Sequence, residues 1–148
     1  MLDEGLYATG QSNRMIADTI RVREGLAPVQ PDGTYTGRTR TLTIGDSAEP
    51  KSNDELKDSY GILITGAVKG EGSVNFGIQL LQQQTIYVTQ RSTNIIREYR
   101  NYLWKKDRLT EKPLNVPVDA FNHAMDAARY GISDILGGKH YEFRVRTA

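Results

Sequence analysis

The chain has 148 residues, of which 38% are hydrophobic and 25% are charged, and its formal net charge is +1. These values are ordinary for one globular domain with a core of its own. There is no cysteine, which excludes disulfide frameworks, zinc ribbons and thiol nucleophiles and fits a reducing compartment. No apolar run approaches the ~20 residues that cross a bilayer, and the N-terminus lacks the pattern of a secretory signal.

Charge is distributed unevenly, with more acidic side chains in residues 1–74 and more basic ones in residues 75–148. This is a weak indication of a basic face, and solvated surface charge is the simpler interpretation. Without cysteine, a metal site must be built from Asp, Glu and His. Such a ligand set favours hard ions such as Mg²⁺ or Mn²⁺.

The first half of the chain alternates between helical and extended patterns. Asn13 can cap a helix that ends at Gly25, and Ser52 with Glu55 forms the pattern of a capping box for a helix that stops at Gly61. The predicted elements are, in order, part of a strand over 1–9, a helix over 14–24, a loop over 26–40, a strand over 41–47, a helix near 52–60 and a strand over 61–68.

The second half continues the alternation. We expect a helix over 73–83, a strand over 85–89, a helix that opens at Ser92 or Thr93, a polar stretch from Trp104 onward and a helix over 117–132. The tail alternates in HYEFRVR and is either an added strand or frayed. Strands that alternate with helices predict an α/β domain with parallel strand pairs. Active sites of such sheets lie at the carboxyl ends of strands, which makes Asp46 the first candidate.

The predicted helix over 117–132 has two faces. Apolar residues recur at spacings of three and four, and Asp119, Asn122, His123 and Asp126 recur in the same way on another side. The spacing alone favours a structural role, with Asp119 as the helix cap and with Asn122 and His123 bonded into a loop. The alternative is catalytic. Asp46 and Asp126 would then hold divalent metal, and His123 would carry protons or orient a ligand.

Other sequence patterns are weaker indications of function. The glycine-rich segment GAVKGEGS lacks GxxxxGK[ST] and is no Walker A loop, so its glycines more simply serve turns, with Lys69 near a phosphate. Ser47 lacks the context of a nucleophile elbow. Trp104 and the tyrosines lie largely at helical core spacing, which makes a base-stacking platform the weaker interpretation.

Several stretches resemble the C-terminal nuclease domain of a tailed-phage terminase large subunit. The matching stretches are GDSAEPKSNDEL (45–56), AVKGEGSVNFGIQLLQ (67–82), IYVTQRSTNIIREYRNYLWKKD (86–107), VPVDAFNHAMDAARYGI (116–132) and, more loosely, EGLYATGQSNRMIADTI (4–20). The order of the stretches, the Asp-Ser-Ala-Glu core and the Asn-His-x-x-Asp core are fairly specific. Together they outweigh the structural interpretation of the polar row.

The resemblance implies an RNase H-like mixed α/β sheet flanked by helices and a two-metal endonuclease that cuts concatemeric double-stranded DNA with Mg²⁺ or Mn²⁺. It implies Asp46 and Asp126 as metal ligands and His123 as their catalytic neighbour. Asp119 and Asn122 would support the site, and Lys51, Lys69 and Arg91 would meet DNA phosphates. It also implies the terminase small subunit and the portal protein as partners, and the cytoplasm of a bacterial host as the location.

Two departures from the family pattern follow. The family has a further metal-binding aspartate on its first strand, and nothing of that kind precedes Glu4, so we expect an N-terminally truncated domain with an open sheet edge. Asp3 and Glu4 are poor substitutes. Residues 26–40 read as an inserted loop and 137–148 as a tail of one domain, 1–148. With a ligand missing, we expect weak activity or none from this chain alone.

Two other functions remain open on the sequence. An RNase H-like relative could resolve branched DNA. A degenerate module, by contrast, would bind DNA or a packaging partner without cutting.

Overall fold

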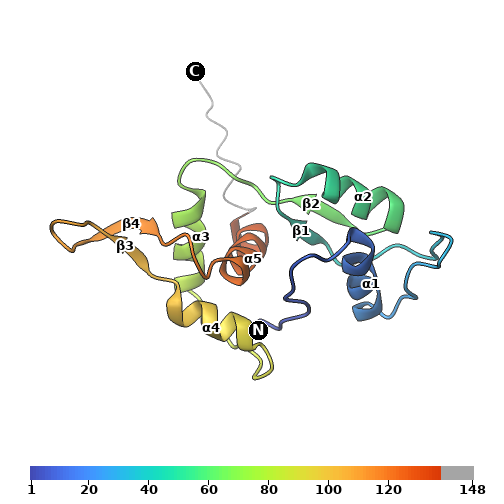
Figure 1. Ribbon diagram of the computed structural model, residues 1–148, viewed down its shortest axis with the longest axis horizontal. Helices are drawn as coiled ribbons and strands as arrows, with labels where there is room; N and C mark the ends of the chain where they lie inside the picture. The colour runs from blue at the N-terminus through green and yellow to red at the C-terminus, as the bar shows by residue number, and fades with distance from the viewer. Residues whose placement is uncertain (138–148) are drawn as a thin grey trace, which may run out of the picture. The chain divides into compact units, whose positions relative to one another are not determined.

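The computed structural model describes residues 1–137, which form two compact units (Figure 1). One unit comprises residues 5–68, and the other comprises residues 1–4 together with residues 69–137; they are called the 5–68 unit and the 69–137 unit below. The tail strand considered for residues 140–146 lies outside the described residues. None of the helices within 1–137 has the length and apolar character needed to cross a membrane.

The 5–68 unit combines two helices with a short parallel strand pair. Its elements are α1 (Asn13–Arg23), β1 (Thr43–Gly45), α2 (Pro50–Tyr60) and β2 (Ile64–Gly66). The parallel pairing sets Thr43 opposite Ile64 and Gly45 opposite Gly66, which confirms the predicted parallel strands. The buried core consists of Ala17, Leu56 and Ile62, with Ile16, Ile20, Tyr60 and Ile64 packed around it.

The helix starts in this unit differ from the predicted ones. The N-cap of α1 is Ser12, whose Oγ accepts a hydrogen bond from the Met15 N–H at 3.3 Å. The predicted cap, Asn13, instead donates to Glu55 at 2.8 Å. The capping box of Ser52 and Glu55 was therefore a wrong prediction, because Glu55 bonds elsewhere and α2 already begins at Pro50.

The end of α2 and the loop after α1 agree with expectation. Gly61 closes α2 in the left-handed region, with a φ of 68°, which glycine adopts at little cost. Residues 26–40 contain no helix or strand. They are held by Arg21, a fully buried side chain of α1 whose guanidinium donates to the carbonyls of Ala27, Thr36 and Gly37 in the loop.

The 69–137 unit is mainly helical. Its elements are α3 (Ser73–Gln82), α4 (Thr93–Asn101), β3 (Trp104–Lys106), β4 (Pro113–Pro117), α5 (His123–Ile132) and the π-helical turn η1 (Ser133–Gly137). The antiparallel β3–β4 hairpin, drawn in orange in Figure 1, was not predicted, because residues from Trp104 onward were taken as one polar stretch; most residues of the two strands are exposed. The predicted strand over 85–89 is reduced to one parallel bridge between Leu2 and Val88.

The last helix begins later than predicted. Residue 117 ends β4, and α5 starts only at His123. Between them, Phe121 has a φ of 54° and is 46% exposed, so it neither continues a helix nor joins an apolar stripe. The prediction of one helix over 117–132 is therefore wrong in its first six residues, where a left-handed residue interrupts the helical periodicity.

Candidate active site

Asp46 lies where the sequence placed it, directly after the carboxyl end of β1. Its Oδ1 accepts a hydrogen bond from the Ala48 N–H at 2.8 Å, and its carbonyl accepts one from the Asn53 side chain at 2.9 Å. The Asn53 side chain passes so close to Gly45 that a Cβ there would overlap it. The turn after β1 is thus fixed by glycine and amide contacts, and it presents Asp46 on an exposed edge.

Asp126 lies in the first turn of α5 and is held by an arginine. The Arg129 guanidinium donates to Asp126 Oδ1 at 2.9 Å, with side-chain exposures of 7% for Arg129 and 29% for Asp126. A Cβ at Gly77 of α3 would overlap the Arg129 side chain, so glycine leaves the path that the arginine follows. The Nε of Arg129 is buried and lacks a hydrogen-bond partner within the described residues.

The pKa of Tyr102 is affected by the charge of Asp126. Burial, and then the negative charge of Asp126, raise the pKa of the Tyr102 hydroxyl above its ordinary value. The Asp126 carboxylate thus lies close enough to the partly buried Tyr102 hydroxyl for its charge to act on that group.

His123 and Asp126 share a helix, whereas Asp119 and Asn122 do not share it with them. His123 is the exposed first residue of α5, three positions before Asp126, which places both on one side of the helix. Asn122 is the N-cap but forms no side-chain cap; its amide donates to Asp119 at 3.3 Å. The prediction that Asp119 caps the helix is wrong, because α5 begins four residues beyond it.

The cap of α5 comes from another helix. Glu98 of α4 is fully buried, and its Oε2 accepts hydrogen bonds from the Ala124 N–H at 2.6 Å and the Met125 N–H at 3.1 Å. A carboxylate at a helix N-terminus satisfies free N–H groups and opposes the positive end of the helix dipole. The sequence carried a signal, since Glu98 lies three residues after Ile95 and next to Tyr99 on an otherwise apolar face; a buried charge there needs partners.

The three residues predicted to contact DNA differ in the contacts that they already make within the protein. Lys51 is exposed on α2, and the Lys69 ammonium lies 5.6 Å from the centre of the Tyr130 ring. Arg91 pairs with Asp3, with 2.8 Å between its Nε and Oδ1. A phosphate at Arg91 would therefore exchange with a carboxylate, whereas one at Lys51 would not displace any hydrogen bond recorded within residues 1–137.

Asp3 and Glu4 have structural partners in the 69–137 unit. Asp3 also accepts a hydrogen bond from the Thr89 hydroxyl at 2.6 Å. Glu4 accepts hydrogen bonds from the N–H groups of Asn94 and Ile95 at 3.1 and 3.2 Å, and so caps α4. Both carboxylates hold the N-terminus to α4 and its preceding turn.

Within residues 1–137 there is no group of three or more His, Cys, Asp or Glu side chains that could hold a metal ion. Asp46 belongs to the 5–68 unit and Asp126 to the 69–137 unit, so a site shared by the two stays a prediction. In chemistry the donors fit: carboxylate and imidazole ligands suit Mg²⁺ or Mn²⁺.

Comparison with known proteins identifies the family. Residues 7–134 match the family described as the terminase RNAseH like domain. The chain belongs to this family. It is similar to the large terminase subunit of Bacillus phage SPP1, with 40% identity over 90 residues that cover 59% of this chain and 21% of that protein. It is also similar to the crystal structure of the nuclease domain of the SPP1 large terminase with bound Mn, at 30% identity and a TM-score of 0.67.

These matches confirm the predicted RNase H-like α/β fold and the assignment to a terminase large-subunit nuclease domain. The structural match covers 86% of this chain but 66% of the SPP1 nuclease domain. The chain therefore spans about a fifth of the relative's full length and two thirds of the nuclease domain that it resembles.

Proposed function

We propose that this domain is a divalent-metal-dependent endonuclease that cuts concatemeric double-stranded DNA for a packaging terminase. The observation that carries the proposal is the similarity of most of the chain to a nuclease domain whose crystal structure contains Mn. Asp46 and Asp126 are the proposed ligands of two Mg²⁺ or Mn²⁺ ions. Bound ions of this kind activate water for attack on a phosphodiester and stabilise the leaving oxygen.

The side chains around Asp126 prepare it for this role. Arg129 takes one carboxylate oxygen, which fixes the direction in which the other oxygen points. Glu98 holds the first turn of α5 through two N–H groups, so Asp126 and His123 stand on a rigid turn. His123 is exposed on that turn and is the proposed proton carrier, because imidazole exchanges protons near neutral pH.

Basic side chains would meet the DNA backbone. Lys51 and Lys69 would each offer a positive charge to a phosphate. Arg91 would have to break its hydrogen bond to Asp3 before it could bind one. Asp119 and Asn122, bonded to one another, are proposed to support the loop that leads into α5. The terminase small subunit, the portal protein and the host cytoplasm belong to the same proposal.

Activity of residues 1–148 alone is proposed to be weak. Two metal ions need several carboxylates to offset their charge, and the described residues do not bring three such donors together. Loss of a ligand lowers the affinity for at least one ion, which slows hydrolysis even where DNA still binds.

Metal binding and DNA cleavage test the proposal separately. Mn²⁺ binding is measured by electron paramagnetic resonance, and nicking of supercoiled plasmid is followed with Mg²⁺ or Mn²⁺. Asp126→Asn and Asp46→Asn should each weaken Mn²⁺ binding by at least about tenfold, because changing even an outer-shell partner of a metal ligand costs that much. Asp54→Asn, an exposed carboxylate of α2, is the matched control.

The outcomes separate the competing functions. Mn²⁺ binding that neither Asp126→Asn nor Asp46→Asn alters would refute these ligands. Rapid cutting by the unmodified chain would contradict the expectation of weak activity. Binding of linear DNA without any metal binding would indicate the non-cutting module, and preference for four-way junctions over linear DNA would indicate a resolvase.

A further inference from the structure

Phe121 combines a strained backbone with an exposed side chain. Its φ of 54° lies in the left-handed region, which costs a bulky residue free energy and which glycine adopts freely. The residue is also 46% exposed, so burial of the ring offsets only part of that cost. Residues in such conformations cluster at active sites and ligand-binding positions, which makes the ring of Phe121 a candidate for contact with a ligand.

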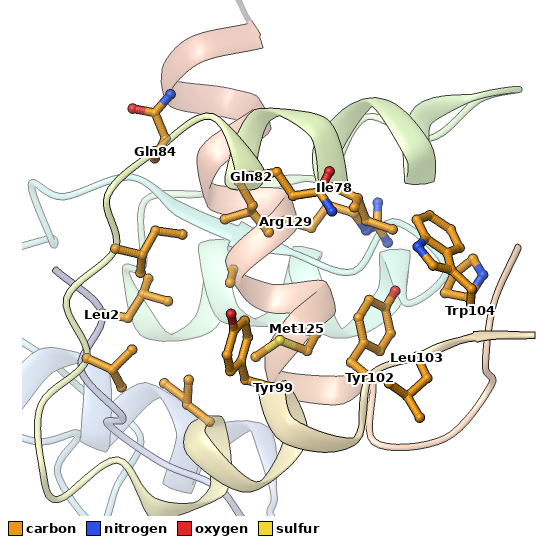
Figure 2. A pocket seen from close by; sticks show the side chains of 16 residues that line it. Leu2, Ile78, Gln82, Gln84, Tyr99, Tyr102, Leu103, Trp104, Met125 and Arg129 are labelled. Atoms are coloured by element: carbon orange, nitrogen blue, oxygen red, sulfur yellow. The ribbon is translucent and has the colours of Figure 1, made fainter. Parts of the chain in front are cut away.

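The ring does not belong to the apolar groove of the 69–137 unit. This groove has a volume of about 490 Å³, and its lining includes Tyr99, Leu103 and Met125 (Figure 2). Phe121 is not one of the lining residues. The groove therefore does not account for a large aromatic side chain at position 121.

Hydrogen bonds on both sides hold the strained turn in place. Before Phe121, the Val118 N–H donates to the Leu103 carbonyl at 2.8 Å. After it, the Asp126 N–H donates to the Asn122 carbonyl at 2.6 Å, which joins the turn to the start of α5. A strained residue persists only where its surroundings fix it in this way. The ring of Phe121 is therefore presented at a defined place on the 69–137 unit.

This place is next to the residues proposed for catalysis. Phe121 comes two residues before His123 and five before Asp126. His123 is the first residue of α5, and Asp126 lies in its first turn. The turn that carries the ring thus continues directly into the helix that carries both side chains. A duplex with a phosphate at His123 and Asp126 would pass close to the ring.

The hairpin that leads into this turn is basic, which favours nucleic acid as the ligand. Its four cations are exposed and make no side-chain hydrogen bond or ion pair recorded within residues 1–137; they are Lys105, Lys106, Arg108 and Lys112. Of the two carboxylates in the hairpin, that of Asp107 already accepts hydrogen bonds from N–H groups of the β3–β4 turn. Unpaired cations together with an exposed aromatic ring suit a ligand that offers both phosphates and bases.

We propose that Phe121 contacts DNA directly, and that its ring enters a base step of the duplex beside the phosphate that His123 and Asp126 address. This inference rests on the nuclease function proposed above and adds a contact with the bases to the contacts with phosphates. Apolar side chains of DNA-bending proteins enter base steps in this way, partly unstack the bases and bend the duplex. Because the turn is already fixed, little backbone freedom is lost when the ring binds.

Two variants that tolerate a left-handed backbone test the ring without changing the turn. Phe121→Gly and Phe121→Asn both suit a positive φ but remove the ring. The anisotropy of a fluorescent duplex measures DNA binding by the complete chain in the absence of divalent metal, and we expect both variants to bind at least about fivefold more weakly. The fluorescence of aminopurine bases in the duplex rises when their neighbours unstack, and this rise should be lost in both variants.

Matched controls separate the ring from the backbone. Phe121→Trp keeps a flat ring and should bind within about twofold of the unmodified chain. Glu111 is the other non-glycine residue of the described chain with a positive φ, also 54°, and it lies between β3 and β4. Glu111→Gly relieves the same backbone conformation and should not weaken DNA binding. The melting temperature of Phe121→Gly should stay within about 2 °C of the unmodified chain, because relief of the strain offsets the lost packing.

The outcomes distinguish this contact from the nuclease function. Unchanged DNA binding and aminopurine fluorescence in Phe121→Gly and Phe121→Asn would overturn the proposal. A fall in melting temperature that parallels the loss of affinity would also overturn it, because the ring would then serve the fold. Absence of Mn²⁺ binding or of cutting would refute the nuclease function alone, since DNA binding is measured without metal. Failure of the unmodified chain to bind any duplex would overturn both.

Discussion

The two units bury different kinds of side chain. In the 5–68 unit, Ala17, Leu56 and Ile62 form a closed apolar cluster. In the 69–137 unit, the apolar side chains face a groove, and the side chains that are most deeply buried are polar or charged, namely Ser92, Glu98 and Arg129. One unit is therefore held mainly by hydrophobic packing, and the other depends on directed polar contacts.

This difference matters for the two proposed halves of the site. Asp46 extends from a strand end backed by a packed core, so its position follows from the fold of its unit. Asp126 stands on a helix fixed by Glu98 and Arg129, which contact the turn that bears it. Removing Glu98 or Arg129 should thus disturb the position of Asp126 directly, whereas Asp46 keeps the apolar core behind its strand even when one polar contact of its turn is lost.

The largest change in unfolding free energy is expected at Arg21, a buried charge in the unit that otherwise has an apolar core. Arg21 is the fully buried charge of the 5–68 unit, bonded to four carbonyls and 5.0 Å from the centre of the Tyr35 ring. Arg21→Met leaves those carbonyls without their donor, and we expect a loss of about 4 kcal/mol in unfolding free energy. Urea denaturation followed by circular dichroism measures it. Arg40→Met, at an exposed position, should cost under about 0.5 kcal/mol; equal losses would contradict the role of Arg21.

The next prediction compares equivalent truncations in the two units. Leu56→Ala empties a site that is 5% exposed and should cost about 3 kcal/mol, because a cavity remains. Leu103→Ala removes a side chain that is 63% exposed on the groove and should cost under about 1 kcal/mol in the isolated chain. Urea titrations of both variants measure the difference. A loss at Leu103 as large as that at Leu56 would mean that the groove is already covered.

Glu98 tests the polar anchoring of the 69–137 unit. Glu98→Ala removes both acceptors at the start of α5 and should cost about 2 kcal/mol, with faster exchange of the Ala124 and Met125 amides. Glu98→Gln keeps a carbonyl oxygen and should lose less. Glu71→Ala, an exposed carboxylate of the same unit, is the control. Unchanged exchange at Ala124 in Glu98→Ala would show that the cap does not hold the helix.

Sequence patterns predicted local features well where the cause is local. The position of Asp46 after a strand and the stop of α2 at Gly61 follow from strand alternation and from the glycine. Sequence patterns gave wrong predictions where the hydrogen-bond partner comes from a distant part of the chain. The N-terminus of α5 is capped by Glu98, 26 residues before Ala124, and not by Asp119 as predicted. Glu55 accepts a hydrogen bond from Asn13, 42 residues earlier, and does not form the predicted capping box. No local pattern contains such partners.

The smallest expected effect concerns Glu55 of the 5–68 unit. The Asn13 amide, and then the Tyr60 hydroxyl, donate to Glu55 at 2.8 and 2.9 Å and lower its pKa below the ordinary 4.5. A lowered carboxyl pKa adds stability above pH 4.5 that is lost as the pH falls through the folded value. Carbon-detected NMR titration of Glu55 should show an upward shift in Asn13→Ala and a smaller one in Tyr60→Phe. A larger shift in Tyr60→Phe would reverse the order of the two donors, while no shift in either would mean that these bonds do not hold the carboxylate in solution.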